Sequence, residues 1–411
     1  MTDLLKPRDG KDAEDAVRWA LAEGKALELI GHGTKRGIGR PAQTDVTLDL
    51  SGLSGVTLYE PEELVLTARA GTPMAEIEAL VASKGQQLAF EPMDYGPLFG
   101  RAAGRGTLGG VLAANVSGPR RIKAGAARDH FLGFTAVSGR GETFKSGGRV
   151  VKNVTGYDLC KLMAGSWGTL AALTEVTIKT LPRPETEATV AVIGLTDAAA
   201  VQAMTAAMGS SCDVSGAAHL PAEVAGSLPL AVAASAGRAL TLLRLEGVAP
   251  SVSHRQVALT EIVKPFGEVG LIPEQASQAL WRAIRDVLPF AAGRVEAGQP
   301  LWRVSTAPAR GAELVSLVAG EGGVPCLYDW AGGLVWLSIP GAGDDAGATA
   351  VRRAVAACGG HATLLRAPAA LRAAVEPFEP QDAALAALTK RVKESFDPKG
   401  AFNPGRIWVG V

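Results

Sequence analysis

The spacing of apolar residues predicts short, alternating helices and strands in the N-terminal part of the chain. Apolar positions at helical spacing predict a helix over residues 13–23, and a short apolar run predicts a strand over 26–30. Alternation of apolar and polar residues predicts two further strands, at 46–50 and 64–70. A second helix begins at Thr72-Pro73, with proline at its first position. This order indicates a small α/β unit of a few strands and two helices.

Residues 187–367 contain one order of elements twice. The first round of strand, helix, strand, strand, helix and short strand falls at 188–194, 196–208, 213–219, 238–246, 251–263 and near 268. The second round, in the same order, falls at 301–306, 310–319, 324–329, 333–339, 345–357 and 361–366. A helix over 275–287 connects them. Two β-α-β-β-α-β units in tandem predict one larger antiparallel sheet with helices on one face.

Composition and charge restrict the class of protein. The chain has 411 residues, 47% of them apolar, which is enough for two or three globular domains. Lysine plus arginine equals aspartate plus glutamate, at 41 each, so no net charge attracts nucleic acid. The N-terminus lacks the apolar segment of a signal peptide, and no apolar run reaches the eighteen residues of a membrane-spanning helix. We therefore expect a cytoplasmic protein that meets the membrane only through partners.

The cysteines argue against a metal centre in this chain. No C-x-x-C pair or Cys/His cluster occurs, so neither a zinc site nor an iron–sulfur cluster fits the usual ligand spacing. The four cysteines are Cys160, Cys212, Cys326 and Cys358. We therefore predict no metal site.

The predicted strand at 26–30 leads into a glycine-rich loop, Gly31-His-Gly-Thr-Lys-Arg-Gly-Ile-Gly39. Its glycines allow backbone amides to converge on an anion, and Lys35 and Arg36 add positive charge. A pyrophosphate-binding loop and a plain turn with solvated basic residues explain this segment equally well. It is not a Rossmann fingerprint, because the spacing is not G-x-G-x-x-G and no long helix follows.

A second glycine cluster lies in the stretch from Gly104 to Leu181. Here Gly106, Gly109 and Gly110 remove side chains where a backbone must lie against a flat or phosphorylated group. Thr107 begins a short predicted helix over 108–115, whose free amides face a phosphate or a flavin edge. Glycine-rich turns also serve plain chain reversal, so this cluster alone does not establish a cofactor.

Several motifs, in this order, resemble one family. They are the loop from Gly31 to Arg36, Glu91-Pro92, Gly106-Thr-Leu-Gly-Gly with Asn115, Ser117-Gly-Pro-Arg-Arg, Arg128-Asp129, Val151-Lys-Asn-Val-Thr-Gly-Tyr-Asp, Gly165-Ser-Trp-Gly-Thr and Phe402-Asn-Pro-Gly-Arg406. The chain resembles the E-type FAD-binding subunits of bacterial glycolate oxidases, which are vanillyl-alcohol oxidase flavoproteins with a PCMH-type FAD domain. The segment at 151–158 is the most specific motif.

The resemblance implies an α+β fold with a two-subdomain, PCMH-type FAD-binding domain at 1–184. An antiparallel-sheet cap domain of two ferredoxin-like halves is expected at 185–375, and a C-terminal segment at 376–411 returns to the FAD domain. Non-covalent FAD is expected, because Thr34 stands where some relatives attach the flavin through histidine. The expected cofactor-binding residues are Gly31, His32, Gly33, Thr34, Lys35, Arg36, Pro92, Thr107, Gly109, Gly110, Asn115, Gly118, Gly156, Tyr157, Gly165, Gly168, Thr169, Asn403 and Arg406.

Oxidation of a 2-hydroxy acid needs a cation for the carboxylate and a base for the hydroxyl proton. Among the predicted cap strands, Arg244, Arg303 and Arg366 are candidates for the cation, and Trp302 and Trp330 are candidates for the site wall. We select Arg303 as the substrate candidate, although strand arginines more often lie on a solvated face. No catalytic base is identified.

Three functions stay open. The resemblance implies an FAD subunit that works with a sister flavoprotein and an iron–sulfur subunit, oxidising glycolate, or D-lactate as a further substrate, and passing electrons to the respiratory chain. A self-sufficient FAD enzyme for another hydroxy acid or alcohol is the second hypothesis. A structural subunit with a vestigial flavin site is the third. The first predicts a cytoplasmic protein held at the inner membrane through its complex.

Overall fold

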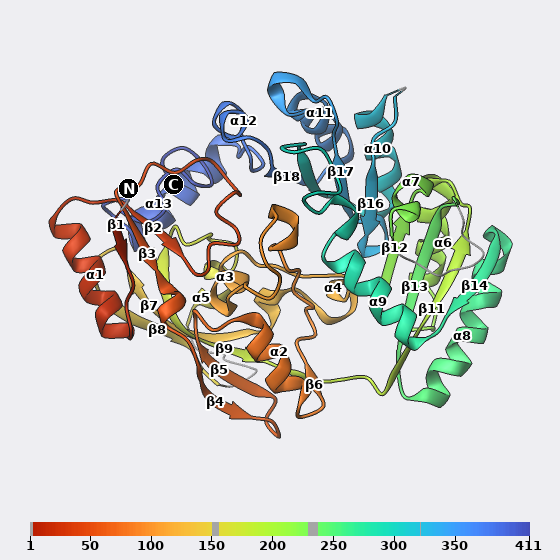
Figure 1. The fold of residues 1–411 in the computed structure, drawn as a ribbon, viewed down its shortest axis with the longest axis horizontal. Helices are drawn as coiled ribbons and strands as arrows, with labels where there is room; N and C mark the ends of the chain where they lie inside the picture. The colour runs from red at the N-terminus through yellow and green to blue at the C-terminus, as the bar shows by residue number, and fades with distance from the viewer. Residues whose placement is uncertain (1–2, 150–155, 229–236, 321) are drawn as a thin grey trace.

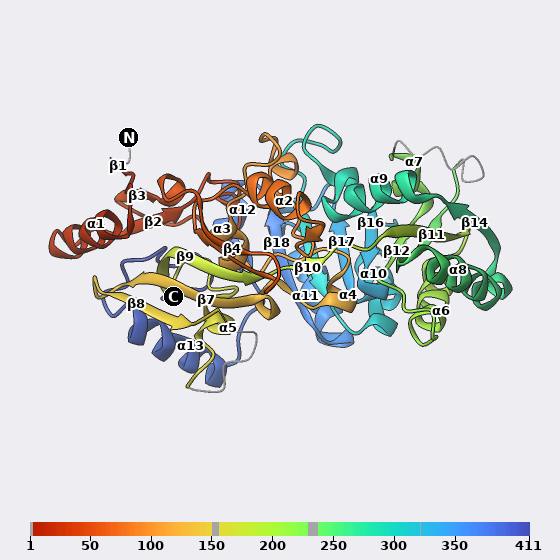
Figure 2. The same cartoon turned by 90° about the horizontal axis from the view of Figure 1, so that it is seen from below.

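A computed structural model describes residues 3–149, 156–228, 237–320 and 322–411. Figure 1 shows two units side by side: an N-terminal unit, residues 3–182, and an eight-stranded sheet with its helices, residues 186–366, which we call the cap. The N-terminal and C-terminal ends of the chain both lie on the side of the N-terminal unit that is remote from the cap (Figures 1 and 2). No helix among the described residues has the length and apolar character needed to cross a bilayer.

The first layer of the N-terminal unit is a parallel sheet of order β1-β3-β2. Its strands are β1 (Asp3–Leu5), β2 (Leu27–Ile30) and β3 (Val46–Asp49). Helix α1 (Gly10–Ala22) precedes β2 and buries Ala13, Val17 and Ala20, which confirms the predicted helix. The glycine-rich loop connects β2 to β3, so it lies between two strands, as the sequence predicts.

The second layer is an antiparallel sheet of order β4-β5-β9-β7-β8. Its strands are β4 (Val56–Glu60), β5 (Val65–Arg69), β7 (Phe131–Ser138), β8 (Thr143–Gly147) and β9 (Ala171–Lys179). The helices of this unit are α2 (Met74–Ala82), α3 (Leu108–Ala113), α4 (Arg121–Ala124) and α5 (Leu159–Met163). Strands β6 (Gln86–Gln87) and β10 (Leu181–Pro182) pair at the exit to the cap. Because α3 packs on β5 and β9, its first turn lies beside the loop after β2.

The cap sheet has the order β14-β11-β13-β12-β16-β17-β15-β18, and all of its pairings are antiparallel. Its first half is β11 (Thr186–Ile193), α6 (Asp197–Met208), β12 (Gly216–Leu220), β13 (Leu240–Gly247), α8 (Ala249–Val263) and β14 (Glu268–Ile272). Its second half is β15 (Leu301–Ser305), α10 (Gly311–Ala319), β16 (Cys326–Asp329), β17 (Leu334–Ser338), α11 (Ala348–Cys358) and β18 (His361–Arg366). Each half is the predicted β-α-β-β-α-β unit, and the halves join where His219 of β12 pairs with Tyr328 of β16.

The two faces of the cap sheet have different neighbours. Helices α6 and α8 cover one face of the first half, and α10 and α11 cover the same face of the second half. The opposite face packs on α9 (Glu274–Arg285) and on the core of the N-terminal unit. Short helix α7 (Ala222–Gly226) follows β12. Side chains on this second face therefore lie between the two units.

The C-terminal segment returns to the N-terminal unit through α12 (Ala369–Ala374) and α13 (Ala383–Phe396). Phe402 then pairs with Leu27 of β2, and the Leu27 amide donates to the Ala401 carbonyl at 2.7 Å. The ammonium of Lys393 is buried and donates to Asp397 and to the carbonyls of Thr169 and Phe402 at 2.6–2.9 Å. These bonds attach the tail to the strand that carries the glycine-rich loop.

Candidate functional site

The candidate cofactor site is a cleft between the loop after β2 and the first turn of α3. It encloses about 710 Å³, open solvent at its mouth included. This volume lies within the range of about 300–1,000 Å³ typical of small-molecule sites. Its lining residues are Leu29, Ile30, Gly31, His32, Gly33, Thr34, Lys35, Arg36, Leu50, Ala70, Thr107, Gly109, Gly110, Ala113, Ala114, Trp167, Gly168, Ala171, Leu173 and Arg406. We call this the flavin cleft.

Three glycines keep the backbone of the flavin cleft bare. A side chain at Gly31 would clash with the hydroxyl of Thr107, and one at Gly109 would meet Ala70 Cβ at 2.7 Å. Thr107 caps α3 by accepting a hydrogen bond from the Gly110 amide at 3.3 Å. Gly33 has φ of 70°, which side-chain-bearing residues rarely adopt. The loop and α3 therefore present main-chain atoms to a ligand at close range.

The two cations that the sequence assigns to this loop differ in the structure. Arg36 forms a bidentate ion pair with Glu28, with Nε at 2.8 Å from Oε1, so its charge is already compensated. Lys35 has no ion pair among the described residues, and its Nζ lies 5.7 Å from the ring centre of Tyr95. Burial, reinforced by the charge of Arg406, lowers the pKa of Lys35 to about 8. Among the described residues, Lys35 is thus the loop cation without an ion pair.

Arg406 of the C-terminal segment is the second cation of the flavin cleft. It stacks on Trp167 at 5.5 Å and donates to the Lys35 carbonyl at 2.8 Å. Burial lowers its pKa to about 10. Two desolvated cations beside each other are unfavourable unless an anion joins them. With the bare backbone and the apolar walls, this donor set fits a pyrophosphate linked to flat ring systems, as in FAD.

Further predicted residues support the walls of the flavin cleft without lining it. Asn403 accepts from the Leu29 amide at 3.0 Å and donates to the Trp167 carbonyl at 2.9 Å. The amides of Gly165 and Trp167 both donate to the Ala113 carbonyl. The buried hydroxyl of Thr169 donates to the Ser166 carbonyl. These bonds fix the relative positions of β2, α3 and the Gly165 to Thr169 segment.

Other predicted cofactor residues lie away from the flavin cleft. Asn115 accepts from the Arg128 amide at 3.1 Å, and Gly118 packs against the Glu91 carbonyl. Gly156 is exposed, and Tyr157 exposes 92% of its surface. Residues 151–155 of the most specific motif lie outside the described residues. A role of these positions in FAD binding stays a prediction.

Pro92 likewise lies away from the flavin cleft and lines a separate polar cleft that adjoins the cap.

The apolar lining of the flavin cleft was not predicted from the sequence. Leu29, Leu50 and Leu173 are strand or strand-end residues that look like ordinary core in the sequence. Only Trp167, between Gly165 and Gly168, carried a local signal, because a large aromatic residue among glycines is unusual in a plain turn.

A second group of polar residues lies on the face of the cap sheet that meets the N-terminal unit. Strand pairing places Arg303 opposite Trp336, and Asp329 opposite Leu334, all on this face. The Arg303 guanidinium lies 5.0 Å from the Trp330 ring and 6.0 Å from the Trp336 ring. Burial lowers its pKa, and nearby Tyr95 and Asp329 oppose that shift. Arg303 therefore faces the N-terminal unit, which is the orientation expected of a residue that binds substrate beside the flavin.

The other cap candidates are engaged elsewhere. Arg366 donates to the backbone carbonyls of Leu98, Phe290 and Gln299. Arg244 is paired with Glu91. Trp302 points to the helix-covered face and donates to the Ala346 carbonyl, so the expectation that it walls the site is wrong.

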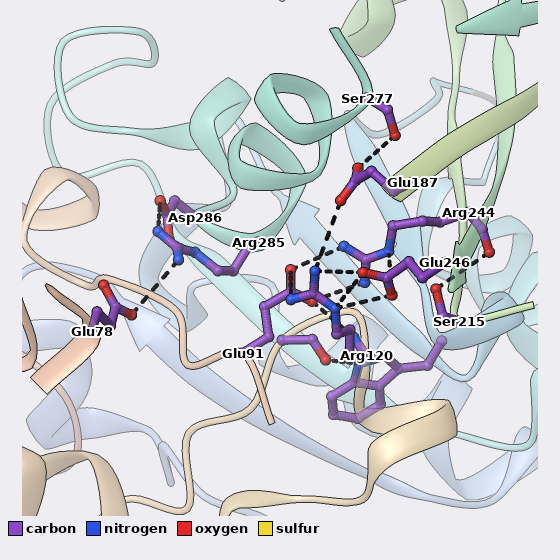
Figure 3. A network of polar contacts seen from close by, with 12 residues as sticks. Glu78, Glu91, Arg120, Glu187, Ser215, Arg244, Glu246, Ser277, Arg285 and Asp286 are labelled. Carbon is purple, nitrogen blue, oxygen red and sulfur yellow. Dashed lines mark hydrogen bonds and ion pairs between the residues drawn. The ribbon is translucent and has the colours of Figure 1, made fainter. Parts of the chain in front are cut away.

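Between the two units lies a cluster of buried charges, Glu91, Arg120, Arg244 and Glu246, which we call the ion cluster (Figure 3). Arg244 donates to both oxygens of Glu91, at 3.0 and 2.9 Å. Arg120 donates to Glu91 through its amide and to Glu246 through its guanidinium, at 2.7–3.0 Å. Burial raises the pKa of Glu91, but the two arginines outweigh it and hold the pKa at about 2. The ion cluster joins the cap strand β13 to the segment after α3.

Comparisons with known proteins agree with this architecture. A family described as "FAD binding domain" matches residues 3–147, and one described as "FAD linked oxidases, C-terminal domain" matches residues 378–407. The chain is 33% identical to the glycolate oxidase subunit GlcE of Escherichia coli over 400 residues, which cover 96% of each protein. It is 32% identical over 149 residues to the glycolate oxidase subunit GlcD of Bacillus subtilis, covering 36% of this chain and 30% of that protein.

A solved structure of similar fold is alkyldihydroxyacetonephosphate synthase. It superimposes with a TM-score of 0.69 and 17% identity, covering 98% of this chain and 75% of that chain. At this identity the likeness shows the fold alone. The architecture is thus an α+β flavoprotein fold with an antiparallel cap sheet, as the sequence predicts.

Proposed function

This chain belongs to the FAD-linked oxidoreductases, in the family of the glycolate oxidase subunit GlcE, and we propose that it is the FAD-binding subunit of a glycolate oxidase complex. The similarity extends over 96% of both proteins, and the flavin cleft supplies the donor set that FAD needs. We also propose the division into an FAD domain at 1–184, a cap at 185–375 and a returning segment at 376–411.

Within the flavin cleft, the residues divide by chemistry. Lys35, Arg406 and the amides of residues 31–34 would hold the pyrophosphate, and the apolar walls would hold the ring systems. When bound, FAD supplies hydride and single-electron chemistry that protein side chains lack. No histidine stands at position 34, so we propose that the flavin is held without a covalent bond.

We propose that the electrons leave through partner subunits, a sister flavoprotein and an iron–sulfur protein. The support is the family itself, whose E. coli member is described as a subunit, and the absence of clustered cysteines from the sequence. Glycolate is the proposed substrate of the complex.

One purification tests this function. The chain is expressed alone and together with its proposed partners, and absorbance spectra are recorded before and after acid precipitation. Flavin released by acid, and reduction of a bound iron–sulfur chromophore by glycolate only in the co-expressed sample, are the expected results. A chain that holds no flavin after incubation with FAD would contradict the cofactor assignment. A flavin-loaded chain that never co-purifies with the partners would contradict the complex.

A further inference from the structure

A buried carboxyl group, Asp329, ends strand β16 on the cap face that meets the N-terminal unit. Only 3% of its surface is exposed. Its Oδ1 accepts a hydrogen bond from the Trp330 amide at 2.7 Å, whereas Oδ2 has no hydrogen-bond partner in the described part of the chain. Buried carboxylates are usually bonded at both oxygens or paired with a cation. Among the described residues, Asp329 therefore has one carboxyl oxygen without a hydrogen bond, at an interface between two units.

The turn that follows Asp329 is strained. Trp330 and Ala331 have φ of 52° and 58°, and Gly332 has φ of 97°. Gly311 lies against the Gly332 carbonyl so closely that a side chain there would clash. Strained backbone of this kind costs about 1–3 kcal/mol per residue and clusters at functional sites. The surrounding structure therefore holds this turn in place, including the bonds from the Trp330 amide to Asp329 and from the Trp330 indole to the Gly118 carbonyl.

Arg303 lies near Asp329 on the same face. The two do not form an ion pair in the described structure, yet each shifts the pKa of the other. Arg121 stacks on the Trp330 ring at 4.2 Å, which makes this indole a shared wall for two guanidinium groups. Arg303 is half-buried and has no ion pair among the described residues, so its guanidinium can offer the bidentate donor pair that a ligand carboxylate requires.

This cap face is adjacent to the flavin cleft through one side chain. Tyr95 is buried between the two sites, with its ring 5.7 Å from Lys35 Nζ of the flavin cleft. On the cap side, the charge of Arg303 opposes the burial that raises the pKa of the Tyr95 hydroxyl. Tyr95 thus connects the Arg303 side of the cap face to the Lys35 side of the flavin cleft.

We propose that Arg303 and Asp329 form a hydroxy-acid site of this chain itself, in which Arg303 binds the carboxylate and Oδ2 of Asp329 takes the proton of the 2-hydroxyl. In this step the O–H bond breaks and its proton moves to Asp329. FAD, when bound in the flavin cleft, would accept the C–H hydrogen with its electron pair, and the product would be the 2-oxo acid. The inference rests on the proposed function because it requires FAD in the flavin cleft, and it places the hydroxy-acid chemistry in this chain.

The charges around Asp329 are suited to this role. Burial raises its pKa to about 7, and nearby Glu91 adds to the rise, while the Trp330 amide, Arg244 and Arg303 oppose it. A base with a pKa near the working pH combines a populated basic form with a useful proton affinity. The charged groups that face it are Glu91 before Pro92, Arg244 of β13 and Arg303 of β15.

The first test uses the flavin-loaded single chain and oxalate, a dicarboxylate that the flavin cannot oxidise by this route. Calorimetry at pH 7.5 in two buffers of different ionisation enthalpy measures binding and proton exchange. A second negative charge raises the pKa of Asp329, so oxalate binding takes up part of a proton in the wild type. We expect no uptake in Asp329→Asn, and at least tenfold weaker binding in Arg303→Met.

The second test is anaerobic bleaching of the same preparation by glycolate. The bleaching rate should rise with pH through about 7 and fall by about 100-fold or more in Asp329→Asn, the usual contribution of a general base. Asp382→Asn is the matched control, because Asp382 also caps a helix through a backbone amide but is exposed, just before α13.

The outcomes separate the two proposals. A flavin-loaded chain that neither binds oxalate nor bleaches overturns the hydroxy-acid site and leaves the FAD-subunit role intact. Equal proton uptake in the wild type and in Asp329→Asn overturns the role of Asp329. A chain without FAD overturns both proposals.

Discussion

Glu91→Gln is the substitution for which the structure gives the clearest magnitude. Glu91 is buried, accepts hydrogen bonds from Arg244 and Arg120, and has a pKa of about 2 against an ordinary 4.5. The difference, 4.5 minus 2, corresponds to about 3 kcal/mol at roughly 1.4 kcal/mol per pKa unit. Removing one partner of a buried ion pair typically costs about 3–5 kcal/mol. We therefore expect the variant to lose about 3–4 kcal/mol of unfolding free energy at pH 7.

The pH dependence has a defined sign. Because the folded pKa lies below the unfolded one, the contribution of Glu91 is complete above about pH 4.5 and is lost as the pH falls toward 2. Glutamine resembles the protonated acid, so the wild type and the variant should converge in stability as the pH falls through this window. Urea unfolding, followed by circular dichroism at several pH values, measures both free energies.

Glu187→Gln is the matched control, since Glu187 lies beside the ion cluster (Figure 3). Burial raises the pKa of Glu187, although the Ser277 hydroxyl that donates to it at 2.7 Å lowers it. Neutralising this residue should therefore leave stability at pH 7 unchanged or increased. Equal losses in the two variants, or a loss below about 1 kcal/mol for Glu91→Gln, would refute the reasoning.

Four further substitutions, one of them a control, test the two sites. Lys35→Met should raise the dissociation constant for FAD at least tenfold, whereas the control Arg36→Met should change it little. Because Lys35 loses its proton above about pH 8, the affinity of the wild type for FAD should also fall between pH 8 and 10. Fluorescence titration measures both effects. Gly31→Ala should prevent FAD retention on gel filtration, because its methyl group clashes with the Thr107 hydroxyl; retention equal to that of the wild type would contradict the close approach. Asp329→Asn should stabilise the chain at pH 8 but not at pH 4 in urea unfolding, because a folded pKa of about 7 makes the native acid lose stability as the pH rises from about 4 to 7.

The order of elements was predictable from the sequence because apolar periodicity records which face of each element is buried. The two β-α-β-β-α-β rounds of the cap are confirmed, with strand and helix ends mostly shifted by one to three residues. One error was avoidable. Trp302 and Arg303 are neighbours on a strand, so they point to opposite faces and cannot both face the same site.

Other features of the sites had no local signal. Glu91, Arg120 and Arg244 are separated by 29 to 153 positions, and only the packing of the cap on the N-terminal unit shows that they meet. Asp329 lies in a Tyr-Asp-Trp-Ala-Gly-Gly turn that looks like an ordinary strand end. Its raised pKa depends on burial, which the sequence does not show.

The attachment of the tail to β2 has a consequence for the timing of biosynthesis. Leu29, in the wall of the flavin cleft, bonds to Asn403, a residue 374 positions later in the chain. Arg406, one of the cations that line that cleft, is made later still. N-terminal regions generally fold first during translation, at about 5–20 residues per second. The glycine-rich loop therefore leaves the ribosome well before its last wall exists, and stable loading of the flavin follows completion of the chain.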